Sequence, residues 1–402
     1  MFNPLEHQGI AVEDQLRSWS ELNVEPYDKR SIHPYSRSRI ILMNGIEVES
    51  ILFSHQFARH CDTPEIRQAL ALGRRVEAQQ QKAINWLSPG DETPLETTIG
   101  YEQVAIDLTA WLARNEPDPY IKQVFDFGLL EDFDHLYRYA NLYELINGGQ
   151  AEELTRRLTE ITPGRPTFVE HRHPTDDVRR HYDRHTVDPL SRLHVLTLVA
   201  GEQQTMNFYM NHGPDFMEPV ARGLYLEIAM IEEQHVTQYE SLMDPLESWL
   251  QQLVHHEYNE CYLYHSFMDE ETDERLRRLW ELHLDMELGQ LQVACRLLRK
   301  FEGVEPEEIL PPALPTPVTF EQNVDYVREV LATQVDLRAD GVDFVDAADE
   351  PATSRTYRER VNEGGVPSEQ VIEENRAANG REYRDELAGE HPVVDLREQT
   401  VG

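Results

Sequence analysis

Eight segments of the chain carry apolar residues at the three- and four-residue spacing that marks the buried face of an α-helix. On each of these apolar stripes, at least one position holds a carboxylate instead. A buried carboxylate is costly unless it is paired, protonated or bound to a metal. The repetition of so costly a residue restricts the fold to one in which the helices bring these acids together.

Clusters of Pro, Gly and Asp separate the segments, and such clusters stop and restart helices. The segments fall into two groups, at about residues 42–61, 64–87, 97–114 and 119–147, and at about residues 190–211, 218–243, 245–268 and 273–302. No segment shows the alternation of a half-buried strand. The sequence therefore predicts an all-α chain. Its expected parts are an N-terminal arm (1–41), a first four-helix bundle (42–150), a polar linker (151–189), a second four-helix bundle (190–303), and a C-terminal helix with an extended acidic tail (304–402).

The inward polar residues recur at matching separations in the two groups. Those of the first group are Glu49, Glu77, Gln80, Glu102, Asp132 and His135. Those of the second group are Glu202, Glu232, His235, Glu257, Glu287 and Gln290. A shift of 155 residues places Glu77 on Glu232. Repetition of both helix lengths and inward carboxylates indicates an internal duplication, with the two bundles in tandem.

Four carboxylates near the middle of one bundle raise each other's pKa values unless a cation lies between them. Two divalent metal ions balance four carboxylates in charge. A carboxylate and a histidine three residues apart project from the same face of a helix, so they can bind one metal together. Di-iron and di-manganese carboxylate bundles use such a set, with a Glu from each of two helices and a Glu-x-x-His from each of the other two.

The pattern resembles the ferritin-like superfamily, in two copies over about residues 42–302. The resemblance implies a carboxylate-bridged centre of iron or manganese, with at most two ions per bundle, that reacts with O₂ or peroxide. The sequence departs from the family's motif at Gln80 and Gln290, where each bundle has an amide in place of its second histidine. Because Gln is a weaker ligand for iron than imidazole, each bundle could hold two ions with one poorly bound, one ion, or none. His283, one turn before Glu287, could serve as a substitute ligand.

Three functions are compatible with these expectations. The first is a non-haem dimetal oxidoreductase, whose electrons would come from a separate donor because no Cys-x-x-Cys pair encodes a rubredoxin-type iron site. The second is a metal-free interaction or structural module, in which the former metal sites have become buried hydrogen-bond networks. The third is iron storage or detoxification, which requires assembly into a cage.

Composition limits the partners and the location. The chain has 74 Asp and Glu residues against 37 Lys and Arg residues, for a net charge of −37, so a basic surface of the size that nucleic acid requires is excluded. No apolar run approaches the length of a membrane span, and the N-terminus lacks the pattern of a signal peptide. The expected location is therefore the cytoplasm. The acidic tail could wrap a second copy of the chain in a homodimer.

Three further groups of residues favour a structural explanation over a functional one. Tyr139 and Tyr239, each four residues after a histidine of the motif, could take part in one-electron chemistry but are expected to be core residues. The His- and Asp-rich segment 170–185 could bind metal or cover the end of a bundle, but a solvated linker is the favoured interpretation. The three cysteines, Cys61, Cys261 and Cys295, are expected to pack as small apolar side chains.

Overall fold

The computed structural model describes residues 2–398, and within this range the chain is mostly helical. The α-helices are α1 (Trp19–Leu22), α2 (Pro34–Arg59), α3 (Pro64–Asn85), α4 (Pro94–Asn115), α5 (Pro119–Asn147), α6 (Ala151–Thr155), α7 (Thr167–Glu170), α8 (Pro189–His212), α9 (Pro219–Glu240), α10 (Trp249–Glu270), α11 (Glu274–Glu302), α12 (Val324–Gln334), α13 (Ala352–Val361) and α14 (Pro367–Asn379). Two short strands, β1 (Leu337–Ala339) and β2 (Phe344–Asp346), pair antiparallel with Leu337 opposite Asp346. The expectation of an all-α chain is therefore correct apart from this hairpin. Of the described helices, none combines the length and the apolar character that a membrane span needs.

The helix ends follow the chemistry of the breaks in the sequence. Most of the long helices begin at a proline, whose fixed φ angle suits the first helical position and whose missing N–H is not needed there. The Asp118 side chain accepts hydrogen bonds from the first backbone N–H groups of α5, and α5 ends at Gly148 with a left-handed φ of 65°. One boundary differs from the expectation. Because Pro34 starts α2, this helix begins inside the stretch expected to be an irregular N-terminal arm (1–41).

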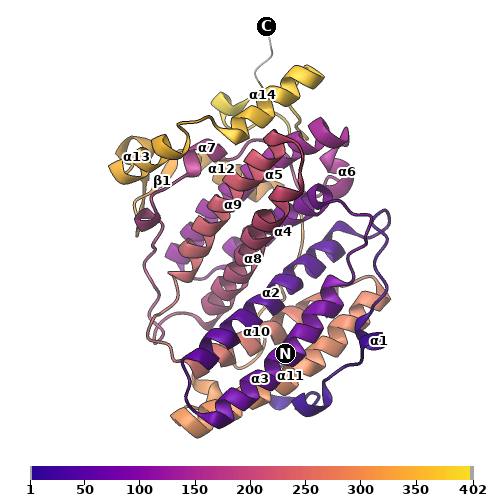
Figure 1. Ribbon diagram of the computed structural model, residues 1–402. Coiled ribbons are helices and arrows are strands. Elements are labelled where there is room, and N and C mark those ends of the chain that lie inside the picture. Colours follow the sequence, from indigo (N-terminus) through magenta and orange to yellow (C-terminus); the bar gives the residue numbers. More distant parts are fainter. Residues whose placement is uncertain (1, 399–402) are drawn as a thin grey trace. The chain divides into compact units, whose positions relative to one another are not determined.

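The chain divides into two compact units, each built from separate stretches of sequence. Unit 1 comprises residues 1–91, 182–201 and 244–319, and unit 2 comprises residues 92–181, 202–243 and 320–402. Unit 1 thus contains α2, α3, α10 and α11, whereas unit 2 contains α4, α5, α9 and the C-terminal half of α8 (Figure 1). Each unit takes helices from both halves of the sequence.

This division corrects the expected tandem of bundles at 42–150 and 190–303. Helices that follow one another do form antiparallel pairs, as with α2 and α3, α4 and α5, and α10 and α11, because short connections keep neighbours together. In unit 1, however, α2 contacts α10 and α3 contacts α11, and in unit 2 α5 contacts α9. Which pair packs against which depends on the fit of two apolar faces, and no local signal in the sequence specifies that choice.

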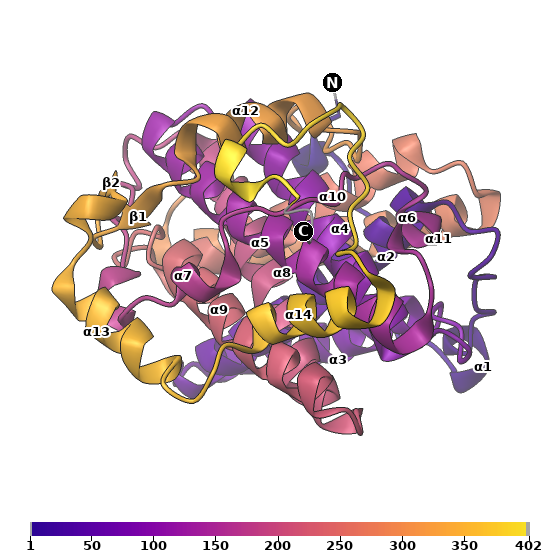
Figure 2. The same ribbon diagram turned by 90° about the horizontal axis from the view of Figure 1, so that it is seen from above.

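From residue 320 onward the described C-terminal region belongs to unit 2. The expected C-terminal helix is present as α12, whereas the expected extended tail after it is wrong as far as residue 398, because this stretch forms α13 and α14. α12 packs against α5, and α14 packs against both α5 and α9 (Figures 1 and 2). Val371 of α14 and Tyr383 belong to the same buried apolar core as Leu136. The few apolar residues of this acidic region lie on the inward faces of its helices, which explains why a low apolar content still gives an ordered structure. Residues 399–402 of the expected tail lie outside the described range.

Candidate metal centre

The interior of unit 2 contains a cluster of acids and histidines carried by α4, α5, α8 and α9. Its members are all buried: Glu102, Asp132, His135, Glu202, Glu232 and His235. Their ligand atoms form two groups of four, and within each group all atoms lie within 4.8 Å of one another. One group includes Glu102 and His135, the other includes Glu202 and His235, and both include Asp132 and Glu232. Such groups could hold a metal ion, and two groups that share two carboxylates offer two adjacent ion positions.

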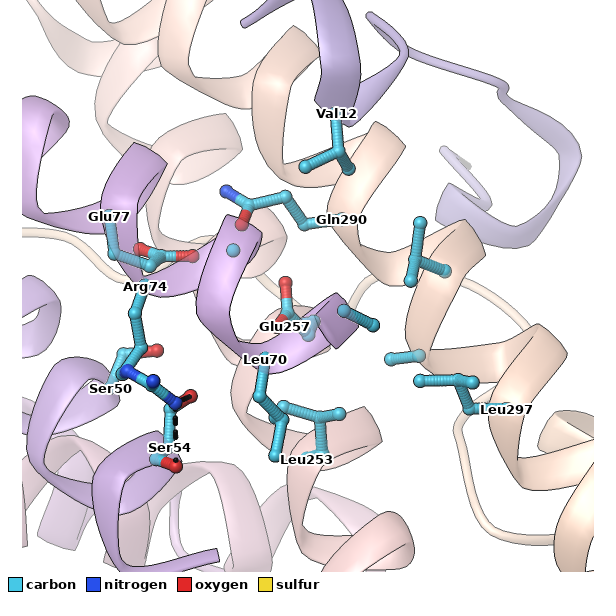
Figure 3. A pocket seen from close by; sticks show the side chains of 14 residues that line it. Val12, Ser50, Ser54, Leu70, Arg74, Glu77, Leu253, Glu257, Gln290 and Leu297 are labelled. Carbon is cyan, nitrogen blue, oxygen red and sulfur yellow. Dashed lines mark hydrogen bonds between the residues drawn. The ribbon is translucent and has the colours of Figure 1, made fainter. Parts of the chain in front are cut away.

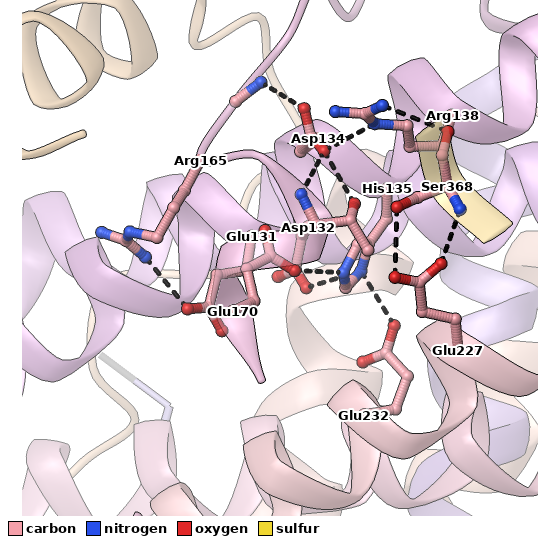
Figure 4. Close-up of polar contacts among 12 residues, drawn as sticks. Glu131, Asp132, Asp134, His135, Arg138, Arg165, Glu170, Glu227, Glu232 and Ser368 are labelled. Carbon is pink, nitrogen blue, oxygen red and sulfur yellow. Dashed lines mark hydrogen bonds and ion pairs between the residues drawn. The ribbon is translucent and has the colours of Figure 1, made fainter. Parts of the chain in front are cut away.

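Both imidazole rings face the carboxylates with the same nitrogen. Nδ1 of His235 lies 3.1 Å from Oε2 of Glu232 and 3.3 Å from Oδ1 of Asp132. Nδ1 of His135 lies 3.2 Å from Oε1 of Glu232 (Figure 4). The ring centroids are 6.0 Å apart. The two histidines thus approach the shared carboxylates from separate positions, each with one edge directed at the cluster.

A further carboxylate holds each imidazole through its other nitrogen. Nε2 of His235 donates to Oε2 of Glu131 at 2.8 Å, and Nε2 of His135 donates to Oε2 of Glu170 at 3.0 Å. A carboxylate acceptor fixes a proton on Nε2 and fixes the orientation of the ring, so that Nδ1 becomes the ligand atom. This is the arrangement by which metal-ligating histidines are usually supported.

The two supporting carboxylates have different surroundings. Glu131 accepts hydrogen bonds from Arg165 and Arg172, each at 3.1 Å (Figure 4 draws the contact with Arg165). Burial alone would raise the pKa of Glu131, but the charge of Arg172 and the hydrogen bond from His235 hold it well below its ordinary value. Burial raises the pKa of Glu170 to about 7 although His135 opposes the change. Glu131, behind His235, is therefore kept ionised by its partners. Glu170, behind His135, has the imidazole as its main charge partner.

Several polar atoms of the cluster are buried and have no hydrogen-bond partner. They are both carboxylate oxygens of Asp132, Oε2 of Glu102, Oε2 of Glu202, Oε1 of Glu232 and Nδ1 of His135. An unsatisfied buried polar atom costs about 1–3 kcal/mol, and more for a charged group, so native structures contain few of them. Because these atoms belong to the side chains of the two four-atom groups, cations bound there would satisfy them together. The donor set therefore fits a metal centre.

Burial and mutual repulsion set the protonation of the cluster. Burial, reinforced by the charge of Glu202, raises the pKa of Asp132 well above its ordinary value, and burial raises the pKa of Glu202 to about 7. Burial would also raise the pKa of Glu232, but its close contacts with the imidazoles of His135 and His235 lower it to about 2. Protons thus carry part of the positive charge that four buried carboxylates need, and metal ions that bind such ligands displace those protons.

Unit 1 contains a second cluster with a different composition. Four buried carboxylates lie within 4.8 Å of one another, one from each of α2, α3, α10 and α11: Glu47, Glu77, Glu260 and Glu287. Where unit 2 has two histidines, unit 1 has two amides. Nε2 of Gln80 donates to Oε1 of Glu47 at 3.2 Å and also to Glu287, and Nε2 of Gln290 donates to Oε1 of Gln80 at 3.2 Å. One histidine and one glutamine were expected in each bundle, but the fold places both histidines in unit 2 and both glutamines in unit 1.

Comparisons with protein-family models, with curated proteins and with solved structures found no match. The chemistry of both clusters is therefore inferred from their own residues.

Two expected ligands, Glu49 and Glu257, do not join the four-carboxylate group of unit 1. Oε2 of Glu49 instead forms an ion pair with Nε2 of His256 at 2.8 Å. Glu257 is buried beside the group but is not one of its four members. Glu47 of α2 and Glu260 of α10 are members of the group instead. Most residues of α2 and α10 are buried, so the apolar spacing of these helices did not identify a single inward face.

The substitute ligand considered for unit 1, His283, also lies outside the group. Its Nδ1 is 3.1 Å from the hydroxyl of Tyr264, and that hydroxyl donates to Glu47. Burial lowers the pKa of His283 to about 3, so the ring is neutral. It is linked to Glu47 of the cluster through the hydroxyl of Tyr264. Tyr139 and Tyr239 are fully buried. The hydroxyl that does contact a ligand of unit 2 is that of Tyr209, which donates to Glu102.

Two supporting residues of unit 2, Glu170 and Arg172, were not predicted because they belong to the polar linker (151–189), and Glu131 on α5 was not predicted either. Glu170 and Arg172 are buried there. The segment is attached to α9 by Gln234, which accepts from the N–H of Arg172 at 2.9 Å and donates to the carbonyl of Glu170 at 3.1 Å. It approaches α5 closely at Gly164, where any Cβ would lie 2.3 Å from the carbonyl oxygen of Leu130. A loop has no repeating face, so no periodic signal could mark these residues. The alternative expectation for segment 170–185 was that it covers the end of a bundle, whereas its contact with Gln234 lies within α9.

Proposed function

We propose that unit 2 is a ferritin-like dimetal-carboxylate centre of iron or manganese, and that the protein is an oxidoreductase acting with O₂ or peroxide. The observation that supports this most directly is the pair of four-atom groups that share Asp132 and Glu232. The six side chains provide one carboxylate from each of two helices and an acid-x-x-His pair from each of two others. This is the ligand set of the di-iron and di-manganese carboxylate bundles, with Asp132 in place of one Glu.

The residues have separate roles in this proposal. Glu102 and His135 would hold one ion, Glu202 and His235 would hold the other, and Asp132 and Glu232 would serve both. Iron or manganese bound there would supply one-electron chemistry with O₂ or peroxide. The protein would exclude water by burying every ligand, and its imidazoles would be oriented by their hydrogen bonds to Glu131 and Glu170.

Electrons for repeated turnover would come from outside the chain. The three cysteines, Cys61, Cys261 and Cys295, are unpaired and widely separated in sequence. They provide no Cys-x-x-Cys motif for a rubredoxin-type iron site. A separate protein or small-molecule reductant is therefore part of the proposal.

The first test is the metal content of purified protein reconstituted anaerobically with Fe²⁺. Glu232→Gln removes one charge from a carboxylate that belongs to both groups, so we expect bound iron to fall by one to two ions per chain, together with loss of the absorbance change on addition of O₂ or peroxide. The matched control is Glu233→Gln, because the neighbouring Glu233 is exposed. Equal iron content and equal oxidation in the two variants would contradict the proposal.

A second prediction concerns the carboxylate behind His135. Glu170→Gln keeps the shape of the side chain but weakens the acceptor of the Nε2–H bond, so iron affinity should fall about 10–100-fold. Titration against a competing chelator measures the change. Glu153→Gln, at an exposed position of the same region, should leave the affinity unaltered. An unchanged affinity in Glu170→Gln would show that Glu170 does not support a ligand.

A further inference from the structure

The carboxylate cluster of unit 1 contains no positively charged side chain. In the described part of the chain, no ion pair joins Glu47, Glu77, Glu260 or Glu287 to Arg, Lys or His. Their hydrogen-bonding neighbours are Tyr264, Gln80 and Gln290. Burial raises the pKa of all four carboxyls, and that of Glu47 reaches about 7. The cluster thus differs from that of unit 2, where two histidines and two arginines share the charge.

A fifth acid, Glu257, lines a cavity together with Glu77 of the group. Glu257 is 7% exposed and its Oε2 has no hydrogen-bond partner. Together with Glu77, Gln290 and Arg74 it lines a cavity of about 40 Å³ that adjoins the group at Glu77, and Arg74 donates to Ser54 there (Figure 3). Both carboxylate oxygens of Glu77, a residue that is 3% exposed, also lack a partner. A cavity needs about 10–15 Å³ to hold one water molecule, so this one has room for water beside Glu77 that could complete the coordination of an ion held by the group.

The donor atoms available to such an ion are all oxygens. Carboxylate and amide oxygens suit hard cations such as Ca²⁺, Mg²⁺ and Mn²⁺, whereas imidazole suits iron and zinc. The amide of Gln80 or Gln290 can present its oxygen by a half-turn about its last bond, since its oxygen and nitrogen have nearly the same shape. Among the residues that the structure describes, the four carboxylates form one group, and this group shares no member with either group of unit 2. This geometry provides for one ion.

We propose that unit 1 binds a single hard divalent cation of the Ca²⁺, Mg²⁺ and Mn²⁺ class through Glu47, Glu77, Glu260 and Glu287, with Glu257 and a glutamine oxygen completing its ligands. The site does not depend on the proposed oxidoreductase activity of unit 2. It gives the second cluster a role of its own, distinct from that of a degraded copy of the first.

Mn²⁺ is the probe, because its electron paramagnetic resonance spectrum distinguishes an isolated ion from a coupled pair. The full-length protein with Asp132→Asn plus Glu232→Gln, which disable unit 2, is treated with a chelator and titrated with Mn²⁺. We expect one bound Mn²⁺ per chain with the spectrum of an isolated ion. Adding Glu77→Gln and Glu260→Gln to this background should weaken that binding by at least about tenfold, because ligand charge sets the affinity of such sites.

The matched control adds Glu281→Gln and Asp285→Asn, which are exposed on α11, to the same background. Circular dichroism checks that each variant keeps its helix content. Equilibrium dialysis of the wild-type protein with Ca²⁺ needs no variant, and one Ca²⁺ per chain is expected. Failure of Mn²⁺ to bind in the disabled background, together with failure of Ca²⁺ to bind to the wild type, would show that shared protons hold the cluster together. Binding that survives loss of Glu77 and Glu260, or a spectrum of coupled ions, would also overturn the proposal, and none of these results would affect unit 2.

Discussion

Replacement of both ligating histidines by glutamine should remove tight iron binding from unit 2. In the His135→Gln plus His235→Gln variant we expect the iron affinity to fall by more than about 100-fold, because even the outer partners of a ligating histidine are worth 10–100-fold. The O₂-dependent absorbance change should be lost with it. The variant gives unit 2 the side chains that unit 1 has at Gln80 and Gln290, and those amides donate to the buried carboxylates of Glu47 and Glu287 without disrupting their helices.

Chelator competition and stopped-flow absorbance measure the two effects. The control is His181→Gln plus His185→Gln, which changes two exposed histidines of the loop before α8. It should leave the iron affinity and the O₂-dependent absorbance change unaltered. Wild-type iron affinity in the His135→Gln plus His235→Gln variant would mean that imidazole nitrogen takes no part in the centre, and the dimetal assignment would fail.

The largest effect on stability is expected at Arg172. Its guanidinium contacts Glu131, and its Nε donates to Oδ1 of Asp177 at 2.5 Å. All three side chains are buried. Arg172→Met should lower the free energy of unfolding by about 3–5 kcal/mol, because removing one partner leaves buried charge uncompensated. Denaturant titration followed by circular dichroism measures this change.

Two further variants separate this explanation from loss of packing. Arg360→Met breaks an ion pair with Glu363 in which both side chains are mostly exposed, so it should change the free energy of unfolding by less than about 1 kcal/mol. Adding Glu131→Gln to Arg172→Met removes one of the stranded charges and should restore part of the lost stability. A loss below about 1 kcal/mol in Arg172→Met, or no recovery in the double variant, would show that the buried charge is not the cause.

The long helices α2 to α5 and α8 to α11 were predictable because their signals are local. N-cap side chains, proline at the first position and glycine after the last turn act within a few residues. With Asp273 as its N-cap and Gly303 as its C-cap, α11 accordingly spans Glu274–Glu302 where 273–302 was expected. The pairing of helical hairpins was not predictable in the same way. It depends on how α5 fits α9 and α2 fits α10, and the connecting segments permit more than one arrangement.

The same distinction between local signals and tertiary contacts applies to the residues of the candidate site. Asp132 with His135 and Glu232 with His235 were identified because each pair lies three residues apart on one helix, and both pairs lie in the unit 2 cluster. Glu47 was missed in favour of Glu49 because α2 is buried on several sides. Glu170 and Arg172 were missed for another reason. They lie in the segment before α8, which has no periodic spacing, and their role depends entirely on tertiary contacts.

The interleaved order of the two units has a consequence for synthesis on the ribosome. Unit 1 combines α2 and α3 with α10 and α11, but α3 ends at Asn85 and α10 begins only at Trp249. At translation rates of 5–20 residues per second, the first hairpin waits roughly 10–30 s for its partner. During that delay its apolar face and its acids Glu47 and Glu77 have no counterpart, so the nascent chain must remain open at its N-terminal end while the helices of unit 2 emerge.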